Sequence, residues 1–116
     1  MTIRINPAPI FRALVAFTLA GEGEASCRFT FRHKSPAALT EWRKTIGTRP
    51  AHESMAEIVE GWEGVVDEDD KPVPYSPAAL ESFLEAHSTR AEDLAKGYLY
   101  ALTESRVKNS HRPPDA

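Results

Sequence analysis

The chain has 116 residues, enough for one domain with a modest core. Hydrophobic residues make up 41% and charged residues 27%, a balance typical of a folded protein and not of a disordered one. The net charge of −3 argues against a nucleic-acid binder, which would carry a basic face. The longest apolar run, Ala13 to Phe17, is far too short to span a membrane. The single cysteine, Cys27, excludes an internal disulfide. We therefore expect a soluble, cytoplasmic protein that binds neither membranes nor nucleic acid.

Two segments near the N-terminus alternate between apolar and polar residues. In residues 11–19, Val15, Phe17 and Leu19 point to one side, and in residues 27–33 the side chains of Phe29 and Phe31 do the same. Period-two alternation with aromatic and β-branched residues predicts strands, and the glycine-containing connector at residues 20–25 predicts a hairpin. Because two strands alone are only marginally stable, helices must cover the aromatic face.

Four helices are expected after the hairpin. Ser35-Pro36 and Ser76-Pro77 each place a serine cap before a proline, which is typical of a helix start. Thr89 with Glu92 has the spacing of a capping box. Caps and apolar spacing together predict helices at residues 36–46, 52–62, 77–87 and 89–108.

The expected fold class is therefore α+β, an N-terminal β-hairpin packed on a bundle of about four helices. We expect a single domain over residues 1–109 and a disordered tail over residues 110–116, which is polar and rich in proline. The core is predicted to contain eleven large side chains: Val15, Phe17, Phe29, Phe31, Leu39, Trp62, Leu80, Leu84, Leu94, Tyr98 and Leu102.

The candidate motifs for catalysis and metal binding are each incomplete. The acidic turn that begins at Asp67 has Pro72 at the position where an EF-hand requires glycine. His52-Glu53 lacks the second histidine of a zinc-protease helix, because residue 56 is alanine. Cys27 lies on an apolar strand face, as a buried structural cysteine does. We therefore expect a protein that is not an enzyme and that holds no cofactor and no metal.

A series of segments over residues 27–109 carries a family resemblance. An aromatic strand ending Phe29-Thr30-Phe31-Arg32 precedes a helix with Glu41-Trp42, and the segment Ile58-Val59-Glu60-Gly61-Trp62-Glu63-Gly64-Val65 follows. An acidic turn then leads into Pro72-Val73-Pro74-Tyr75-Ser76, and the last helix ends Arg106-Val107-Lys108-Asn109. In this order and spacing the chain resembles the small tail assembly chaperones of long-tailed bacteriophages and their prophages. It departs from the pattern at Asp70, where a turn glycine is more usual.

The resemblance implies a non-enzymatic chaperone that binds the tape-measure protein and keeps it soluble while tail-tube protein assembles around it. Such a chaperone acts in the bacterial host cytoplasm, has the tape-measure and tail-tube proteins as partners, and is absent from the mature virion. The alternative is a structural subunit, a minor tail or head–tail connector protein. The sequence leaves the oligomeric state open, a homo-oligomer included.

The client site is expected wherever apolar surface remains after the core has formed. Four amphipathic helices and a hairpin offer more large apolar residues than so small a domain can cover. Apolar patches that stay exposed usually mark a partner surface. The candidate partner-binding residues are Trp42, Val65, Val66 and Tyr75.

Overall fold

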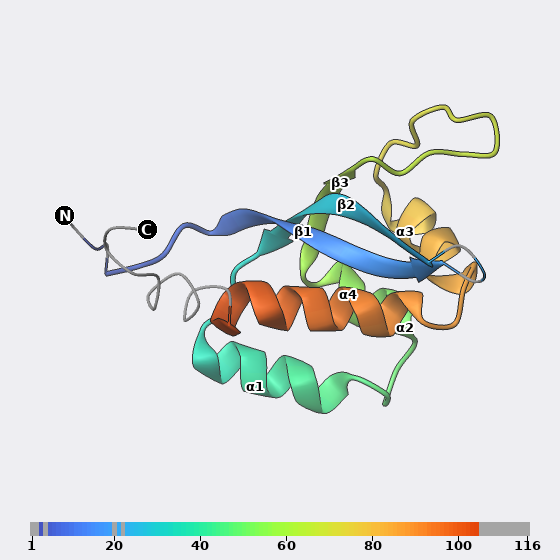
Figure 1. Ribbon diagram of the computed structural model, residues 1–116. Helices are drawn as coiled ribbons and strands as arrows, with labels where there is room; N and C mark the ends of the chain where they lie inside the picture. Colours follow the sequence, from blue (N-terminus) through green and yellow to red (C-terminus); the bar gives the residue numbers. More distant parts are fainter. Residues whose placement is uncertain (1–2, 4, 20, 22, 105–116) are drawn as a thin grey trace.

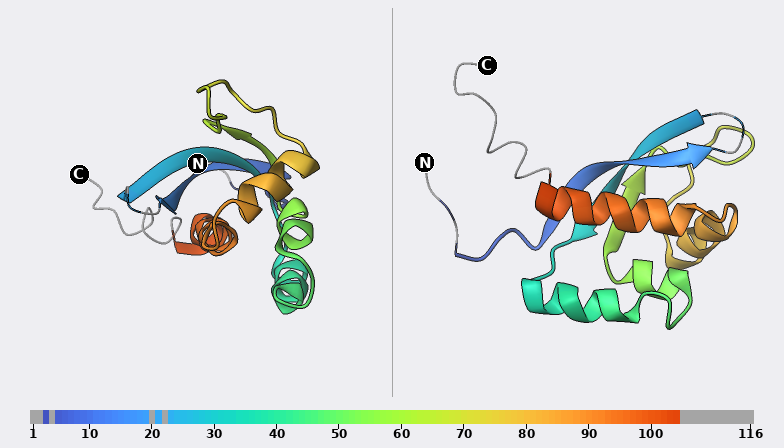
Figure 2. Two further views of the ribbon diagram at one scale, coloured as in Figure 1. Left: turned by 90° about the vertical axis from the view of Figure 1, so that its right-hand side faces the viewer. Right: turned by 60° about the horizontal axis from the view of Figure 1, so that its bottom comes forward.

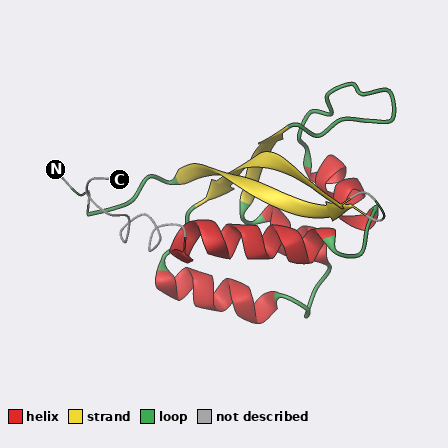
Figure 3. Cartoon of the chain, in the orientation of Figure 1, coloured by secondary structure: helices red, strands yellow, loops and turns green. Residues whose placement is uncertain are grey.

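The computed structural model describes residues 3, 5–19, 21 and 23–104. This part of the chain forms a three-stranded antiparallel sheet and four α-helices, with one π-helical turn at the end (Figures 1 and 3). The predicted α+β class is confirmed. In chain order the elements are β1 (Ile10–Leu19), β2 (Gly23–Arg32), α1 (Pro36–Thr45), α2 (Ala51–Ala56), β3 (Val59–Glu63), α3 (Pro77–Glu85), α4 (Arg90–Leu99) and η1 (Tyr100–Glu104).

The predicted hairpin is present and is longer than expected. β1 and β2 pair in register from Ile10 opposite Arg32 to Leu19 opposite Gly23. The connector is therefore shorter than residues 20–25, because backbone pairing continues to the turn even where the side chains are exposed. Gly21 and Gly23 adopt φ angles of 75° and 86°, which non-glycine residues rarely adopt.

The prediction of a helix over residues 52–62 is wrong for the second half of this range. The structure ends α2 at Ala56 and places residues 59–63 in β3, which pairs with β2 so that Trp62 lies opposite Phe29. The apolar spacing of this segment suited a helix, but Gly61 has low helix propensity and Val59 favours a strand. Pairing with the edge of the hairpin satisfies the backbone groups of β2 and covers Phe29 with an indole ring at 6.0 Å.

The helices lie on one face of the sheet, and the core lies between the sheet and the helices (left view of Figure 2). Eight of the eleven expected core residues are buried, whereas Leu39, Trp62 and Leu102 are half-buried. Four further side chains complete the buried core: Trp42, Met55, Ile58 and Val59. Trp42 enters the core because its indole Nε1 donates to the carbonyl oxygen of Ser54 at 2.8 Å, which satisfies its polar atom.

The two serine caps are confirmed. The hydroxyl oxygens of Ser35 and Ser76 accept hydrogen bonds from the backbone N–H of Ala38 and Ala79, at 3.2 and 3.0 Å. The capping box at Thr89 is wrong. Its hydroxyl lies 3.0 Å from His87 Nδ1 and makes no hydrogen bond to the start of α4.

The last helix also differs from its expected course over residues 89–108. Regular α-helix ends at Leu99 and continues as the π-helical turn η1. The remainder of the predicted helix, residues 105–108, and the predicted tail, residues 110–116, lie outside the described residues. A π-helical turn is rare and frequently occurs at functional sites, which directs attention to this end of the molecule.

Candidate partner-binding site

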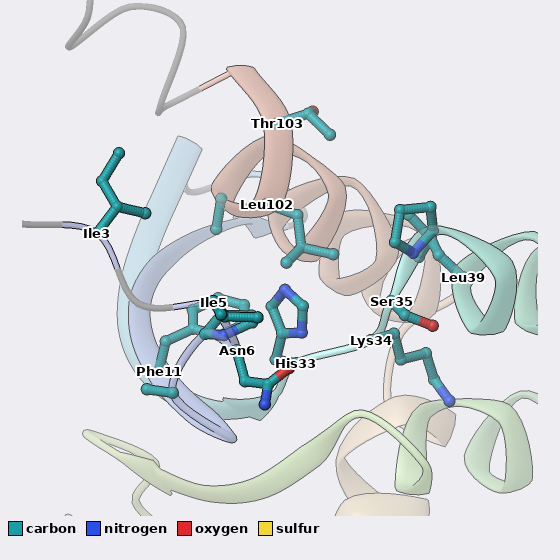
Figure 4. Close-up of a pocket in the computed structure, with 14 residues that line it drawn as sticks. Ile3, Ile5, Asn6, Phe11, His33, Lys34, Ser35, Leu39, Leu102 and Thr103 are labelled. Atoms are coloured by element: carbon teal, nitrogen blue, oxygen red, sulfur yellow. The ribbon is translucent and has the colours of Figure 1, made fainter.

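An open, mainly apolar groove lies where η1 meets the segment that leads into β1. It has a volume of about 1020 Å³. Three parts of the chain form its walls: the N-terminal segment, the connection from β2 into α1, and η1 (Figure 4). Its apolar lining includes Ile3, Ile5, Pro7, Phe11, Leu39 and Leu102. For comparison, two turns of an α-helix about 10 Å wide occupy roughly 850 Å³, so the groove has room for a short helical segment.

The local sequence explains why this groove remains open. Pro7 and Pro9 keep the segment before β1 out of regular secondary structure, since proline cannot continue a regular interior element. Ser35-Pro36 starts α1 immediately after the hairpin and turns the chain away from the sheet. Within the described part of the chain no further element covers this end, where Ile3 and Ile5 are exposed and Phe11, Leu39 and Leu102 are half-buried.

The rim of the groove is its most exposed apolar part. The relative exposure of Ile3 is 93% and that of Ile5 is 98%. On the opposite wall, the ammonium group of Lys34 lies 3.6 Å from the Glu57 carboxylate. The charge on that wall is thus largely neutralised, and the groove presents an apolar surface.

The structure does not bring the four predicted partner-binding residues together. Trp42 is 2% exposed, its indole packs edge-on against Tyr98 at 5.4 Å, and it is therefore part of the core of the folded chain. Val65, Val66 and Tyr75 belong instead to the loop that follows β3 and projects beyond the sheet (Figure 1). They stay a predicted site, separate from the groove.

The base of this loop packs against Trp62 of β3, whereas its tip projects beyond the sheet. Trp62 Nε1 donates to the carbonyl oxygen of Val73 at 2.7 Å, and Tyr75 packs edge-on against Trp62 at 5.1 Å. Val65 and Tyr75 are half-buried as a result, whereas Val66 is 49% exposed. Of the three loop residues, Val66 offers the most apolar surface to a partner.

Sequence patterns did not identify Ile3 and Ile5 as part of a site, because the two prolines marked residues 1–10 only as an irregular lead-in. A usable signal was present: Ile3 and Ile5 alternate with polar residues ahead of Pro7, as in a half-covered extended segment. No sequence pattern predicts the π-helical turn η1, whose Leu102 forms the opposite wall of the groove.

Burial raises the pKa values of ionisable side chains that lie in or against the core. Burial raises the pKa of the Cys27 thiol, although the nearby Arg90 opposes this effect, so the nucleophilic thiolate is disfavoured. Burial also raises the pKa of Tyr98 to about 12, which keeps its hydroxyl protonated and donating to the carbonyl oxygen of Arg32 at 2.7 Å. Among the residues placed by the structure, no group of three or more His, Cys, Asp or Glu side chains could hold a metal ion.

The family described as YdaY prophage protein matches residues 32–99, more than half of the chain. The chain belongs to the YdaY prophage protein family. No curated protein and no solved structure matches. The prophage origin agrees with the broader part of the family resemblance noted above, and the finer assignment to tail assembly chaperones is a matter for proposal.

The two ends of the YdaY match coincide with the ends of a strand and a helix beside the groove. It begins at Arg32, the last residue of β2, and ends at Leu99, the last residue of α4. The loop with Val66 and the core around Trp42 fall inside it, whereas Ile5, the whole of β1 and η1 fall outside it. The groove is thus built at the point where the matched segment meets the two ends of the chain. In the described residues of this YdaY family member, no helix is long and apolar enough to cross a membrane.

Proposed function

We propose that this YdaY family member is a phage tail assembly chaperone, a non-enzymatic protein that binds the tape-measure protein and keeps it soluble during tail-tube assembly. The observation that carries the proposal is the apolar groove with its two almost fully exposed isoleucines. Exposed apolar surface of this kind marks a partner site, and an open groove suits the apolar face of an amphipathic helix. Membership of a prophage family and the ordered resemblance over residues 27–109 support the same assignment.

The chemistry of the client follows from the groove. A tape-measure protein is a long, largely helical and aggregation-prone chain, so its amphipathic segments carry apolar stripes that must be shielded before assembly. A groove with room for a short helical segment shields one such stripe at a time. We infer that the chaperone acts in the bacterial host cytoplasm, requires no cofactor, and leaves before the virion is complete.

Co-expression with a tape-measure fragment tests the proposal. Ile5→Asp places a charge on the rim of the groove, at a position exposed enough for the fold to be unaffected. It is expected to move the fragment from the soluble to the insoluble fraction. Val66→Asp places the same charge on the alternative loop site, and it is expected to leave the fragment soluble if the groove alone binds the client.

Each other outcome of the co-expression identifies a specific error. If Val66→Asp loses the fragment and Ile5→Asp keeps it, the client binds the predicted loop site of Val65, Val66 and Tyr75. If the wild-type protein fails to hold the fragment in solution, the chaperone assignment is wrong. The alternative, a minor tail or head–tail connector protein, requires the chain to be present in purified particles, and the chaperone proposal requires its absence from them.

A further inference from the structure

The imidazole ring of His33 points into the apolar groove. The alternation of β2 puts His33 on the same face of the sheet as the buried Phe31, whereas the exposed Arg32 between them faces the other way. The backbone N–H of His33 donates to the carbonyl oxygen of Pro9 at 2.9 Å, so pairing with the N-terminal segment fixes this orientation. In Figure 4 the ring is directed toward Leu102 on the facing wall. A polar ring therefore lies within a surface that is otherwise mainly apolar.

Most other polar side chains of the groove already have partners within the chain. The hydroxyl of Ser35 caps α1. The hydroxyl of Thr103 donates to a backbone carbonyl oxygen of the preceding turn at 2.7 Å, and the ammonium group of Lys34 extends away from the groove toward α2 (Figure 4). Neither the ring nitrogens of His33 nor the side-chain amide of Asn6 has a hydrogen-bond partner among the described residues. These two side chains are thus left for a partner that enters the groove.

The charged groups around the His33 ring are of one sign. Over the described lining, the titratable side chains are His33 itself and Lys34, and no carboxylate faces the groove. The residues that the N-terminal segment, α1 and η1 contribute to this lining are all uncharged. The carboxylate of Glu57, on the far side of Lys34, is already paired with both Lys34 and Arg49. A carboxylate that enters the groove therefore meets neutral or positively charged groups.

We propose that the groove selects helical segments that carry one aspartate or glutamate within their apolar stripe, and that the protonated imidazole of His33 binds this carboxylate. Asn6 offers a further donor from the N-terminal wall. The inference rests on the proposed function, since it names the chemistry of the client segment that the same groove binds. His33 is thus a specificity-determining residue, whereas the apolar walls shield the rest of the stripe.

Other stripes fit the groove less well. A purely apolar stripe would cover the imidazole without giving it a partner, and an unpaired buried polar group costs roughly tenfold to a hundredfold in affinity. A lysine or arginine in the stripe would bring a second positive charge beside His33 and Lys34. A carboxylate instead gives the ring a charge-assisted hydrogen bond, which is about twice as strong as a neutral one.

Protonation of His33 makes this selection depend on pH. Histidine changes its charge between about pH 5 and pH 8, and only the protonated ring carries a positive charge for the carboxylate. Binding of an acidic stripe is therefore expected to strengthen as the pH falls from about 8 to about 6. A purely apolar stripe is expected to show the opposite trend, because burying a charged ring costs more than burying a neutral one.

Binding of three helical peptides to the full chain tests the proposal. Their sequence is that of the tape-measure segment which the wild-type chain keeps soluble, with glutamate, glutamine or lysine at one position in the centre of the apolar stripe. In fluorescence anisotropy at about pH 6, the glutamate peptide is expected to bind about tenfold more tightly than the glutamine peptide, and the lysine peptide is expected to bind most weakly. At about pH 8 the advantage of the glutamate peptide is expected to shrink severalfold.

Two variants assign the effect to one histidine. His33→Gln keeps a polar side chain but cannot become charged, so it is expected to lose both the preference for glutamate and its dependence on pH. His87→Gln is the matched control, because His87 lies in the turn between α3 and α4, outside the groove, and it is expected to keep both.

The outcomes separate this inference from the proposed function. Equal binding of the glutamate and glutamine peptides by the wild-type chain overturns the inference and leaves the proposed function standing, as does an unchanged preference in His33→Gln. Binding of none of the three peptides overturns the proposed function and the inference with it. If His33→Gln fails to fold, the comparison of the three peptides on the wild-type chain decides the case.

Discussion

At Gly97, α4 packs closely against Val15 of β1, and replacement of this glycine by alanine would improve helix propensity but crowd the packing. A Cβ at Gly97 would lie 2.8 Å from Val15 Cγ1, 3.0 Å from Cγ2 and 3.3 Å from Cβ. Valine is stiff about χ1, so Val15 cannot rotate out of the way. Alanine favours the helix by about 1 kcal/mol, whereas overpacking a core costs about 1–3 kcal/mol. The cost of crowding Val15 is therefore expected to exceed the gain in helix propensity, and Gly97→Ala is expected to lower the free energy of unfolding by about 1 kcal/mol.

The reasoning is tested by a double-mutant cycle in urea. Val15→Ala alone leaves a cavity and is expected to cost about 2–3 kcal/mol. In that background Gly97→Ala no longer meets the valine methyl groups, so it is expected to stabilise the chain by about 1 kcal/mol. The change of sign gives a coupling of about 2 kcal/mol between the two sites. If Gly97→Ala stabilises the wild-type chain, α4 does not pack on β1 as described.

Three further outcomes are expected. Trp42→Phe keeps an aromatic ring in the core but removes the donor to the carbonyl oxygen of Ser54, so urea unfolding is expected to show a loss of about 1–3 kcal/mol; an unchanged midpoint would contradict the buried hydrogen bond. The pKa of Tyr98 is raised to about 12 from near 10 in an unfolded chain, so its contribution to stability is complete below pH 10 and is lost as the pH rises toward 12. Tyr98→Phe is therefore expected to flatten the fall of stability between pH 10 and pH 12, and an equally steep fall would show that other groups cause it. EDTA is expected to leave the melting temperature unchanged, and a drop of several degrees would reveal a structural metal.

The hairpin and the serine caps could be predicted because local chemistry decides them. Alternation in residues 11–19 and 27–33 has one physical solution, a half-buried pair of strands, and a serine before a proline satisfies the first N–H groups of a helix. The third strand could not be predicted. The choice between helix and strand for residues 59–63 depends on the unpaired edge of β2, which is far away in the sequence.

In the acidic turn that begins at Asp67, the family pattern correctly indicates a position with a glycine-like backbone conformation. Asp70 stands where the resemblance expects glycine, and it adopts φ 60°, the left-handed conformation that favours glycine. Asp67 holds this turn, since its Oδ1 atom accepts from the backbone N–H groups of Asp69 and Lys71 at 2.8 and 3.0 Å. Aspartate is tolerated there because it adopts the left-handed conformation more readily than most residues other than glycine.

The candidate site was harder to predict than the fold. Burial of Trp42 depends on the carbonyl of Ser54 being within reach of its indole, a contact between two helices that no local pattern reveals. The groove arises from three segments that meet only in space, at the N-terminal segment, the start of α1 and η1. Sequence patterns identify apolar residues, but only the packing shows which of them remain uncovered.

Hydrogen exchange of the chain with and without a soluble tape-measure segment tests the central claim most directly. If the groove binds this client, backbone amides on both of its walls, in residues 10–12 and 99–103, are expected to exchange more slowly in the complex. Amides of the projecting loop around Val66 are expected to exchange at an unchanged rate. Slower exchange confined to that loop would move the site there, and unchanged exchange throughout, at client concentrations that saturate a micromolar site, would contradict tape-measure binding.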